Sequence, residues 1–345
     1  MKLLVTGGAG FIGSAGGRMA VGRGYQGVNV DALTYAACLD SLAGVAADPR
    51  YRFEHVDIRD RAALDRVFAE HRPDAVLHLA AESHVDRSID APAIFVETNV
   101  LGTCNLLDAA RKHYIDSNRP DRFRFVHVST DEVFGTLGEI GAFDENTAYD
   151  PRSPYSASKA ASDHFARAWA ETYGLPVIIT NCSNNYGPYQ FPEKLVPVAI
   201  LNALQGRPIP VYGAGQNVRD WLYVDDHAAA LLKVLGSGRK GDTYLIGGNS
   251  EARNIDLVRM ICRALDVVRP SGRPYENLIE FVSDRPGHDF RYAIDATHIR
   301  QALGWGPTVS LAEGVARTVD WYLTNEAWWR PLLSRRGVGQ RLGAA

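Results

Sequence analysis

The stretch Thr6-Gly7-Gly8-Ala9-Gly10-Phe11-Ile12-Gly13 decides the fold of this 345-residue chain. It follows a short apolar run, Leu3–Thr6, that predicts a strand, and it opens a helical pattern. Glycines at this spacing permit a tight turn and let the backbone approach a pyrophosphate, which the amide groups of a helix N-terminus can bind. The stretch therefore predicts the first strand–helix unit of a dinucleotide-binding domain.

An acidic residue stands where such a domain binds a ribose. Asp31 ends the second predicted strand, about 20 residues beyond the glycines. Its carboxylate can accept a hydrogen bond from a ribose 2′-hydroxyl and would repel a 2′-phosphate, so NAD is favoured over NADP. We expect Asp57-Ile58 near the adenine ring and Ala80-Ala81-Glu82-Ser83 on the nicotinamide side. Taken alone, Asp57 also suits a helix cap.

Apolar runs alternate with helical patterns along the first half of the chain. Strands are predicted at Leu3–Thr6, Val28–Asp31, Phe53–Asp57, Ala75–Leu79, Phe123–Ser129 and Val177–Thr180, and helices at Arg61–Glu70, Ala91–Lys112 and Ala157–Tyr173. This alternation predicts an α/β fold, a Rossmann-type doubly wound parallel sheet. After about Asn181 the elements become shorter and richer in Gly and Pro. We expect residues 1–180 to form the NAD-binding domain, 181–330 an interleaved, smaller C-terminal α/β substrate-binding lobe, and 331–345 a flexible tail.

Composition argues against several classes of protein. The net charge of −3 gives no reason to expect nucleic acid or an anionic membrane as a partner. The apolar run at the N-terminus is too short for a signal peptide or a membrane span. The four cysteines, Cys38, Cys104, Cys182 and Cys262, lack paired spacing, which is typical of free thiols and not of a disulfide frame or a zinc site. A cytoplasmic protein without a metal is expected.

A second group of polar residues follows the fifth predicted strand. Thr130, Asp131 and Glu132 come directly after the apolar run, and Tyr155 and Lys159 are four residues apart on one helical face. A nearby ammonium and the positive charge of the nicotinamide ring both favour the ionised form of a tyrosine, which lowers its pKa toward working pH. Tyr155 can then take a hydroxyl proton as a hydride leaves the same carbon for NAD, and Thr130 can orient that hydroxyl.

The adjacent acids Asp131 and Glu132 have no use in a simple dehydrogenation. Oxidation of one carbon acidifies the neighbouring C–H bond, so one carboxylate can remove that proton while a protonated carboxyl assists a departing hydroxyl. Adjacent acids oppose each other's ionisation, which helps keep one of them protonated. The pair predicts elimination of water from a transiently oxidised sugar, and a solvated pair of loop acids is the alternative.

From Met1 to about Leu323, the chain resembles the extended short-chain dehydrogenase/reductases, and among them the dTDP-glucose 4,6-dehydratase family. The motifs that carry the resemblance are TGGAGFIG, VDALTY, HLAAESHVDRSI, STDEVFG, SPYSASK, TNCSNNYGPYQFPEKL, VRDWLYVDDH and DRPGHDFRYAID. The resemblance implies a tightly held NAD that is reduced and reoxidised within one turnover. It implies that Tyr155 is the base at the C4 hydroxyl, that Glu132 takes the C5 proton and that Asp131 protonates the departing C6 hydroxyl. The implied product is dTDP-4-keto-6-deoxyglucose.

The same resemblance implies two sets of binding residues and a dimer. For NAD the residues are Gly7, Gly10, Phe11, Ile12, Gly13, Asp31, Ala32, Leu33, Thr34, Asp57, Ile58, Leu79, Ala80, Ala81, Ser83, Thr98, Tyr155, Lys159 and Asn185. For the nucleotide sugar they are Ser83, Thr130, Asn184, Lys194, Leu195, Pro210, Val211, Tyr212, Arg219, Asn254, Arg285 and His288. The family's dimers imply that Leu101–His113 and Ala160–Tyr173 pair with a second subunit, although their apolar stripes suit the monomer core equally.

Several alternatives stay open at this point. The nucleotide base is open between dTDP, UDP and others. A related 4-epimerase or decarboxylase is the alternative within the class, and Asp131 disfavours both. A non-catalytic NAD-sensing protein is the alternative from another class. Two departures from the family's pattern stand out: Phe134 replaces the usual Tyr, which favours a packing role, and Gly16-Gly17 in the first helix costs about 1 kcal/mol per glycine.

Overall fold

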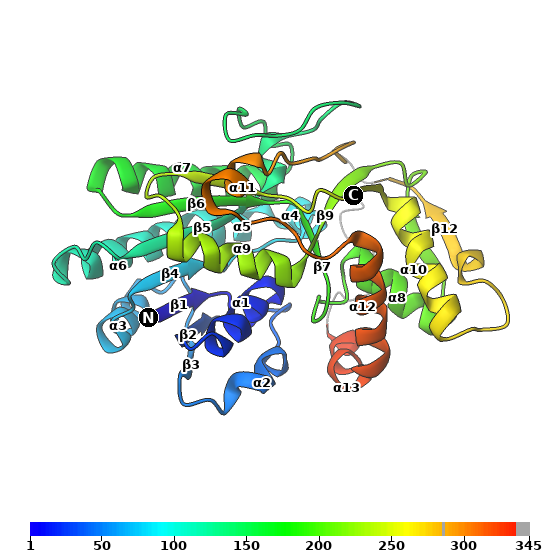
Figure 1. The fold of residues 1–345 in the computed structure, drawn as a ribbon, viewed down its shortest axis with the longest axis horizontal. Helices are drawn as coiled ribbons and strands as arrows, with labels where there is room; N and C mark the ends of the chain where they lie inside the picture. The colour runs from blue at the N-terminus through cyan, green and yellow to red at the C-terminus, as the bar shows by residue number, and fades with distance from the viewer. Residues whose placement is uncertain (285–286, 336–345) are drawn as a thin grey trace.

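A seven-stranded parallel sheet dominates the computed structural model of the chain, which describes residues 1–284 and 287–335 (Figure 1). Its strand order is β10-β6-β5-β4-β1-β2-β3, and every neighbouring pair is parallel. The order reverses between β1 and β4, and in sheets of this kind ligands bind beyond the carboxyl ends of the strands at that point. The predicted Rossmann-type fold is confirmed.

The elements of the structure have the following bounds. The strands are β1 (Lys2–Thr6), β2 (Gln26–Asp31), β3 (Tyr51–His55), β4 (Ala75–His78), β5 (Arg124–Thr130), β6 (Val177–Cys182), β7 (Asn184–Tyr186), β8 (Ile209–Tyr212), β9 (Val218–Tyr223), β10 (Thr243–Ile246), β11 (Glu251–Arg253) and β12 (Ile279–Val282). The α-helices are α1 (Phe11–Gly22), α2 (Ala43–Ala46), α3 (Arg61–His71), α4 (Val85–Asp90), α5 (Pro92–Phe95), α6 (Thr103–Asp116), α7 (Pro154–Tyr173), α8 (Leu195–Leu204), α9 (Val224–Ser237), α10 (Asn254–Val268), α11 (Thr297–Leu303), α12 (Leu311–Thr324) and α13 (Glu326–Trp329). The 3₁₀ helices are η1 (Leu39–Leu42), η3 (Asp131–Phe134), η4 (Tyr275–Leu278) and η5 (Pro331–Ser334), and η2 (Val96–Gly102) is a π-helix.

The strands are apolar on both faces because helices cover both. Successive side chains of a strand point to opposite faces, and in β1 Leu3 and Val5 join one core while Leu4 joins the other. The first core includes side chains of α1, α9 and α11, and the second those of α3, α6 and α7. This double burial explains the near-continuous apolar runs of the sequence.

Several predicted bounds differ from those of the structure, and the differences in two helices have a local cause. Helix α7 begins at Pro154 and not at Ala157, because Ser153 and Ser156 form a reciprocal capping box and Pro154 fits the first helical position. The single predicted helix Ala91–Lys112 is interrupted by the π-turn η2, an irregularity that hydrophobic spacing does not reveal.

The second half of the chain builds a smaller lobe and also returns to the main sheet. Strand β10 lies at the edge of the seven-stranded sheet, beside β6. The smaller lobe has its own core, with side chains of α8, α10 and α12, and Figure 1 shows these helices together to one side of the sheet. Part of the expected tail belongs to this lobe, because Leu332 in η5 is buried in its core and Arg335 donates hydrogen bonds to the carbonyls of Tyr35 and Ala37.

Candidate active site

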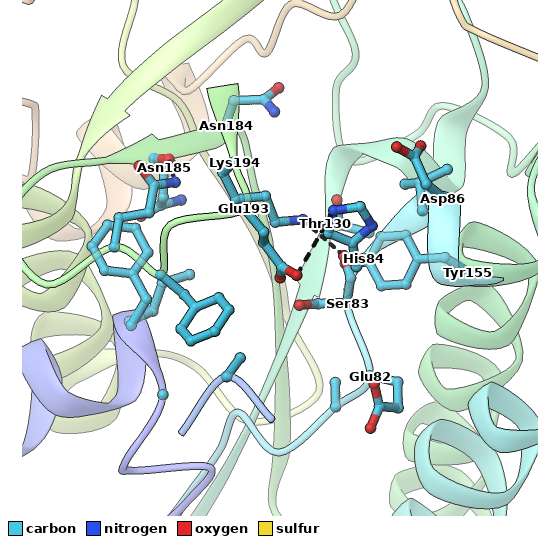
Figure 2. Close-up of a pocket in the computed structure, with 18 of the residues that line it drawn as sticks. Glu82, Ser83, His84, Asp86, Thr130, Tyr155, Asn184, Asn185, Glu193 and Lys194 are labelled. Carbon is cyan, nitrogen blue, oxygen red and sulfur yellow. Dashed lines mark hydrogen bonds and ion pairs between the residues drawn. The ribbon is translucent and has the colours of Figure 1, made fainter. Parts of the chain in front are cut away.

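A cavity of about 930 Å³ opens at the carboxyl ends of the sheet strands and extends to the smaller lobe. Residues from the glycine stretch, from the ends of β2, β4, β5 and β6, and from α8 and β8 line it. Figure 2 shows side chains from several of these elements converging around Thr130 and Tyr155. The site therefore forms at the edge of the sheet that the strand order predicts.

The glycine stretch forms a cradle at one end of the cavity. Gly7 has φ +68°, and a Cβ there would lie 2.6 Å from the backbone nitrogen of Ala80. A Cβ at Gly13 would lie 2.2 Å from the carbonyl oxygen of Gly7. A Cβ at Gly10 would meet only that same oxygen, at 3.2 Å, so Gly10 leaves free space in front of the loop. The backbone can thus approach a phosphate group closely.

Helix α1 begins at this cradle without a side-chain cap. Gly10 is the N-cap residue, no side chain caps the helix, and its first turn holds no acidic residue. At such a helix N-terminus, the free backbone amides and the positive end of the helix dipole favour binding of an anion. Asp31 lies nearby at the end of β2, where its carboxylate accepts hydrogen bonds from the amides of Ala9 at 2.9 Å and Leu33 at 2.8 Å. These residues fit a dinucleotide.

Most of the predicted NAD-binding residues line the same cavity. Those that do are Gly7, Gly10, Phe11, Ile12, Gly13, Asp31, Ala32, Thr34, Asp57, Ile58, Leu79, Ala80, Ala81, Ser83, Thr98, Tyr155, Lys159 and Asn185. Leu33 does not: it has φ +53° and lines a neighbouring hollow with Tyr35 and Arg335. The helix-cap alternative for Asp57 is wrong, because Asp60 caps α3 and Asp57 pairs with Arg59.

The end of β5 directs the two acids into the cavity. Thr130 is the N-cap of η3, and its hydroxyl accepts from the amide of Glu132 and donates to Oδ1 of Asp131, both at 3.3 Å. Asp131 is 2% exposed, and its Oδ2 finds no hydrogen-bond partner among the described residues. Glu132 is only half-buried. The two neighbours therefore have unlike environments.

Burial acts strongly on the ionisation of Asp131. Loss of hydration raises its pKa well above the ordinary value, and the negative charges of Glu132 and Asp220 add to the rise. The positive charge of Arg219 and the hydrogen bond from Thr130 oppose it. The expected neutral carboxyl of the pair is thus Asp131, which makes this side chain suited to donate a proton.

The first turns of α7 place Tyr155 and Lys159 beneath the cavity. Both are buried, and Nζ of Lys159 donates to the carbonyl of Val128 at 2.9 Å. Burial, followed by the charge of Glu132, raises the pKa of Tyr155 well above its usual value, and a hydrogen bond with Thr130 opposes the rise. Lys159 alone therefore does not lower the pKa of Tyr155 as expected, because burial and the nearby acid outweigh it.

The smaller lobe forms the wall of the cavity opposite the NAD-binding side. All predicted sugar-nucleotide residues among the described ones line the cavity, namely Ser83, Thr130, Asn184, Lys194, Leu195, Pro210, Val211, Tyr212, Arg219, Asn254 and His288. Arg285 lies outside the described residues. Nζ of Lys194 donates to the carbonyl of Ser83 at 3.2 Å, which joins the two walls (Figure 2). Arg219 is buried, with its guanidinium 4.2 Å above the ring centre of Tyr292.

Glu82 lines the cavity as the sequence predicted, but sequence reasoning missed Cys182, Gln190 and Arg207 among others and left His84 and Glu193 without a role. Cys182 had a signal: it ends β6 directly beside Thr130, so its strand end had to reach the same edge. For Gln190 and Arg207 no local pattern points to the cavity. Phe134 is buried, with ring centres of Phe143 and Tyr149 each 5.2 Å away, which agrees with a packing role.

The fold and this site define an extended short-chain dehydrogenase/reductase. The family model described as GDP-mannose 4,6 dehydratase matches residues 4–318. The dTDP-glucose 4,6-dehydratase of Escherichia coli is 55% identical, and that of Neisseria meningitidis serogroup B is 57% identical, each with 99% of both chains covered. The chain belongs to the dTDP-glucose 4,6-dehydratase family.

Solved structures agree with this placement. The structure of DesIV, a dTDP-glucose 4,6-dehydratase from Streptomyces venezuelae with NAD and TYD bound, has a TM-score of 0.89 and 47% identity, covering 96% of this chain and all of that one. A UDP-glucose 4-epimerase from Thermus thermophilus in complex with NAD has a TM-score of 0.84 and 30% identity, covering 94% of this chain. The fold is thus shared with epimerases, whereas the higher identity is with the dehydratase.

Proposed function

We propose that this protein is an NAD-dependent dTDP-glucose 4,6-dehydratase, which converts dTDP-glucose to dTDP-4-keto-6-deoxyglucose. The observation that carries the proposal is the pair Asp131 and Glu132 beside Tyr155. Asp131 is buried, which raises the pKa of its carboxyl, and Glu132 is half-buried in the same cavity. An acid and a base side by side next to a Tyr/Lys pair suit elimination of water after oxidation.

NAD, when bound in the glycine cradle, would supply hydride transfer, accepting hydride from C4 and returning it to C6 after the hydroxyl there has left. Every other step is performed by side chains of this chain. Tyr155 takes the proton of the C4 hydroxyl, and Thr130, whose hydroxyl hydrogen-bonds with Tyr155, orients that hydroxyl. Lys159 provides a positive charge beneath the tyrosine, which favours its ionised form.

The elimination step is divided between the two acids. Glu132 removes the C5 proton, which the C4 keto group has made acidic, and Asp131 gives its proton to the departing C6 hydroxyl, so that water leaves. The two acids start in opposite protonation states, which the unequal burial of their side chains supports. A 4-epimerase needs neither group, and for this reason Asp131 favours the dehydratase.

The division of the cavity supports a nucleotide-sugar substrate. We assign residues 1–180 to NAD and 181–330 to the nucleotide sugar, with β10 and α9 returning to the sheet. On the second side, Arg219, Lys194 and Asn254 offer donors for a diphosphate and its ribose. The choice of dTDP over UDP rests on the relatives, which are named as dTDP-glucose enzymes.

The experiment that tests this function follows a label. The purified protein is given dTDP-glucose carrying deuterium at C4, without added reductant, and the product is examined by NMR. Deuterium at C6 of a 4-keto-6-deoxy product supports the proposal. Loss of the label to solvent or to free NADH would reject it, and the same assay with UDP-glucose decides the base preference.

We also propose a homodimer in the cytoplasm. Leu101 in η2 is 56% exposed, Phe165 and Tyr173 on α7 are 38% and 43% exposed, and α7 packs against η2. Large apolar side chains exposed on neighbouring helices suit a protein–protein contact. Light scattering should give twice the chain mass, and the double variant Leu101→Glu/Phe165→Glu should give the monomer mass. The four free thiols fit a reducing compartment.

A further inference from the structure

Asp163 is a carboxylate buried beneath the proposed catalytic residues. It lies on α7 one helical turn beyond Lys159, and no part of it reaches solvent. It does not line the cavity, so it has no contact with a substrate or cofactor there. A buried carboxylate is costly unless its oxygens accept hydrogen bonds and a positive charge lies near. The groups around Asp163 therefore indicate what its charge does.

Four side chains from three parts of the chain surround this carboxylate. Its Oδ1 lies 3.0 Å from Nε2 of His127, and its Oδ2 accepts from the hydroxyls of Ser129 at 2.7 Å and Tyr149 at 2.9 Å. Nδ2 of Asn181 donates to the same oxygen at 3.4 Å. The carboxylate thus joins α7 to β5, to β6 and to the segment that precedes α7.

The other titratable groups around Asp163 and Lys159 are neutral near pH 7. Burial lowers the pKa of His78 on β4 and of His127 on β5. Burial raises the pKa of Cys182 on β6 to about 12, and it also raises that of Tyr149. Arg167, which contacts the Tyr149 hydroxyl at 3.5 Å, is exposed, so solvent screens its charge.

Among the buried groups just described, Lys159 and Asp163 therefore carry the two opposite charges. Burial opposes the charge on each. The pKa of Asp163 nevertheless stays below its ordinary value, because the hydrogen bonds from His127 and Ser129 and the charge of Lys159 favour its ionised form. Burial lowers the pKa of Lys159, and Asp163 is the main group that acts against this. Each charge stabilises the other.

We infer that Asp163 is a positioning residue for the proposed reaction: it is the buried counter-ion that keeps Lys159 charged beneath Tyr155. It also steadies the end of β5, because the Asn181 amide that touches it donates to the carbonyl of Thr130 at 3.0 Å. The inference rests on the proposed function, in which Lys159 acts on Tyr155 by its charge.

The test is the variant Asp163→Asn, which keeps the shape of the side chain and removes its charge. The measurement is the pH profile of bound-NAD reduction after mixing with dTDP-glucose. An opposite charge at close range shifts a pKa by about 1–3 units, so the alkaline limb, where Lys159 loses its proton, should move about 1–3 pH units lower. Lys159→Ala should move the profile the other way, because Tyr155 then lacks the ammonium. An unshifted limb in Asp163→Asn would overturn the inference.

A matched control separates charge from general destabilisation. Asp226 on α9 is also a buried carboxylate, and it accepts from the Thr308 amide at 2.9 Å, the Thr308 hydroxyl at 2.6 Å and the Val309 amide at 2.9 Å. It does not line the cavity. Asp226→Asn should lower stability and leave the pH profile in place. An equal shift in this control would also overturn the inference.

Two further comparisons keep the result decisive. A wild-type protein that does not reduce its bound NAD with dTDP-glucose rejects the proposed function itself, whereas an active wild type with an unshifted Asp163→Asn profile rejects only the role of Asp163. If Asp163→Asn does not fold, the stability of the double variant Asp163→Asn/Lys159→Met tests whether the two residues are a counter-ion pair. A counter-ion pair requires that removing both charges restores folded protein, and a double variant no more stable than the single one contradicts the pair.

Discussion

Replacing Asp131 with Asn tests the proposed elimination step most directly. Asn is nearly isosteric with Asp, and its amide oxygen can keep the hydrogen bond that the Thr130 hydroxyl donates to Oδ1. The change removes the proton that Asp131 is proposed to give to the C6 hydroxyl, and it leaves Tyr155 and Glu132 in place. We expect a folded protein that still oxidises C4 but eliminates water slowly.

The expected effect on activity follows from the role of a general acid. Such groups contribute about 10²–10⁴-fold to the step that they assist. Product formation by Asp131→Asn should therefore fall by about that factor, and bound NADH should accumulate because oxidation continues while elimination lags. Some exchange of the C5 proton with solvent should persist, because Glu132 can still remove it.

The expected effect on stability depends on pH, with a definite sign. Burial, and then the charge of Glu132, raises the pKa of Asp131 in the folded state. Between about pH 4 and the raised pKa, the folded protein holds a proton on Asp131 that the unfolded chain has released. The free energy of unfolding of the wild type therefore falls as pH rises through this window, by up to about 1.4 kcal/mol per pH unit. The Asp131→Asn variant does not titrate, so it should gain on the wild type across that window.

Three measurements check these expectations. Rapid mixing with dTDP-glucose follows the absorbance of bound NADH, NMR follows product and C5 exchange in deuterated water, and urea unfolding at several pH values gives the free energy of unfolding. Glu132→Gln is the matched variant, in which C5 exchange should collapse together with product formation. Wild-type turnover by Asp131→Asn would remove Asp131 from the mechanism. A stability difference that does not change with pH would show that its carboxyl is ionised.

Four further predictions concern Tyr155, Lys159 and two glycines of helix α1. Tyr155→Phe should keep the fold but leave bound NAD unreduced by substrate, and unchanged formation of bound NADH would contradict its role as base. Lys159→Ala should lower the rate of the same step and raise its pH optimum, which a pH series of the initial rate checks. Gly17→Ala should stabilise the protein by about 0.5–1 kcal/mol in urea unfolding, since a Cβ there would lie 3.5 Å from its nearest neighbour, a Leu42 methyl. Gly13→Ala should instead weaken NAD retention after gel filtration, because its Cβ would lie 2.2 Å from the Gly7 carbonyl. Equal behaviour of the two glycine variants would contradict the cradle.

Local sequence patterns predicted much of this protein's architecture. The glycine stretch between β1 and α1, the acid at the end of β2 and the alternation of apolar runs with helices all act within a few residues of one another, so the sequence alone indicated the parallel sheet and the cofactor end of the cavity. The spacing of Tyr155 and Lys159 is also a local pattern, because helical geometry puts residues four apart on one face.

Only the tertiary structure determines which side chains are ionised and which residues from distant parts of the chain meet. The sequence placed Asp131 beside Glu132, but burial of one and partial exposure of the other determine which carboxyl is neutral. The sequence suggested that Lys159 and the nicotinamide charge together lower the pKa of Tyr155, but it could not show that burial of Tyr155 raises this pKa. It gave no sign that Asp163 meets His127, Ser129 and Asn181. Desolvation and charge act through space, and their strength depends on neighbours that come from distant parts of the chain.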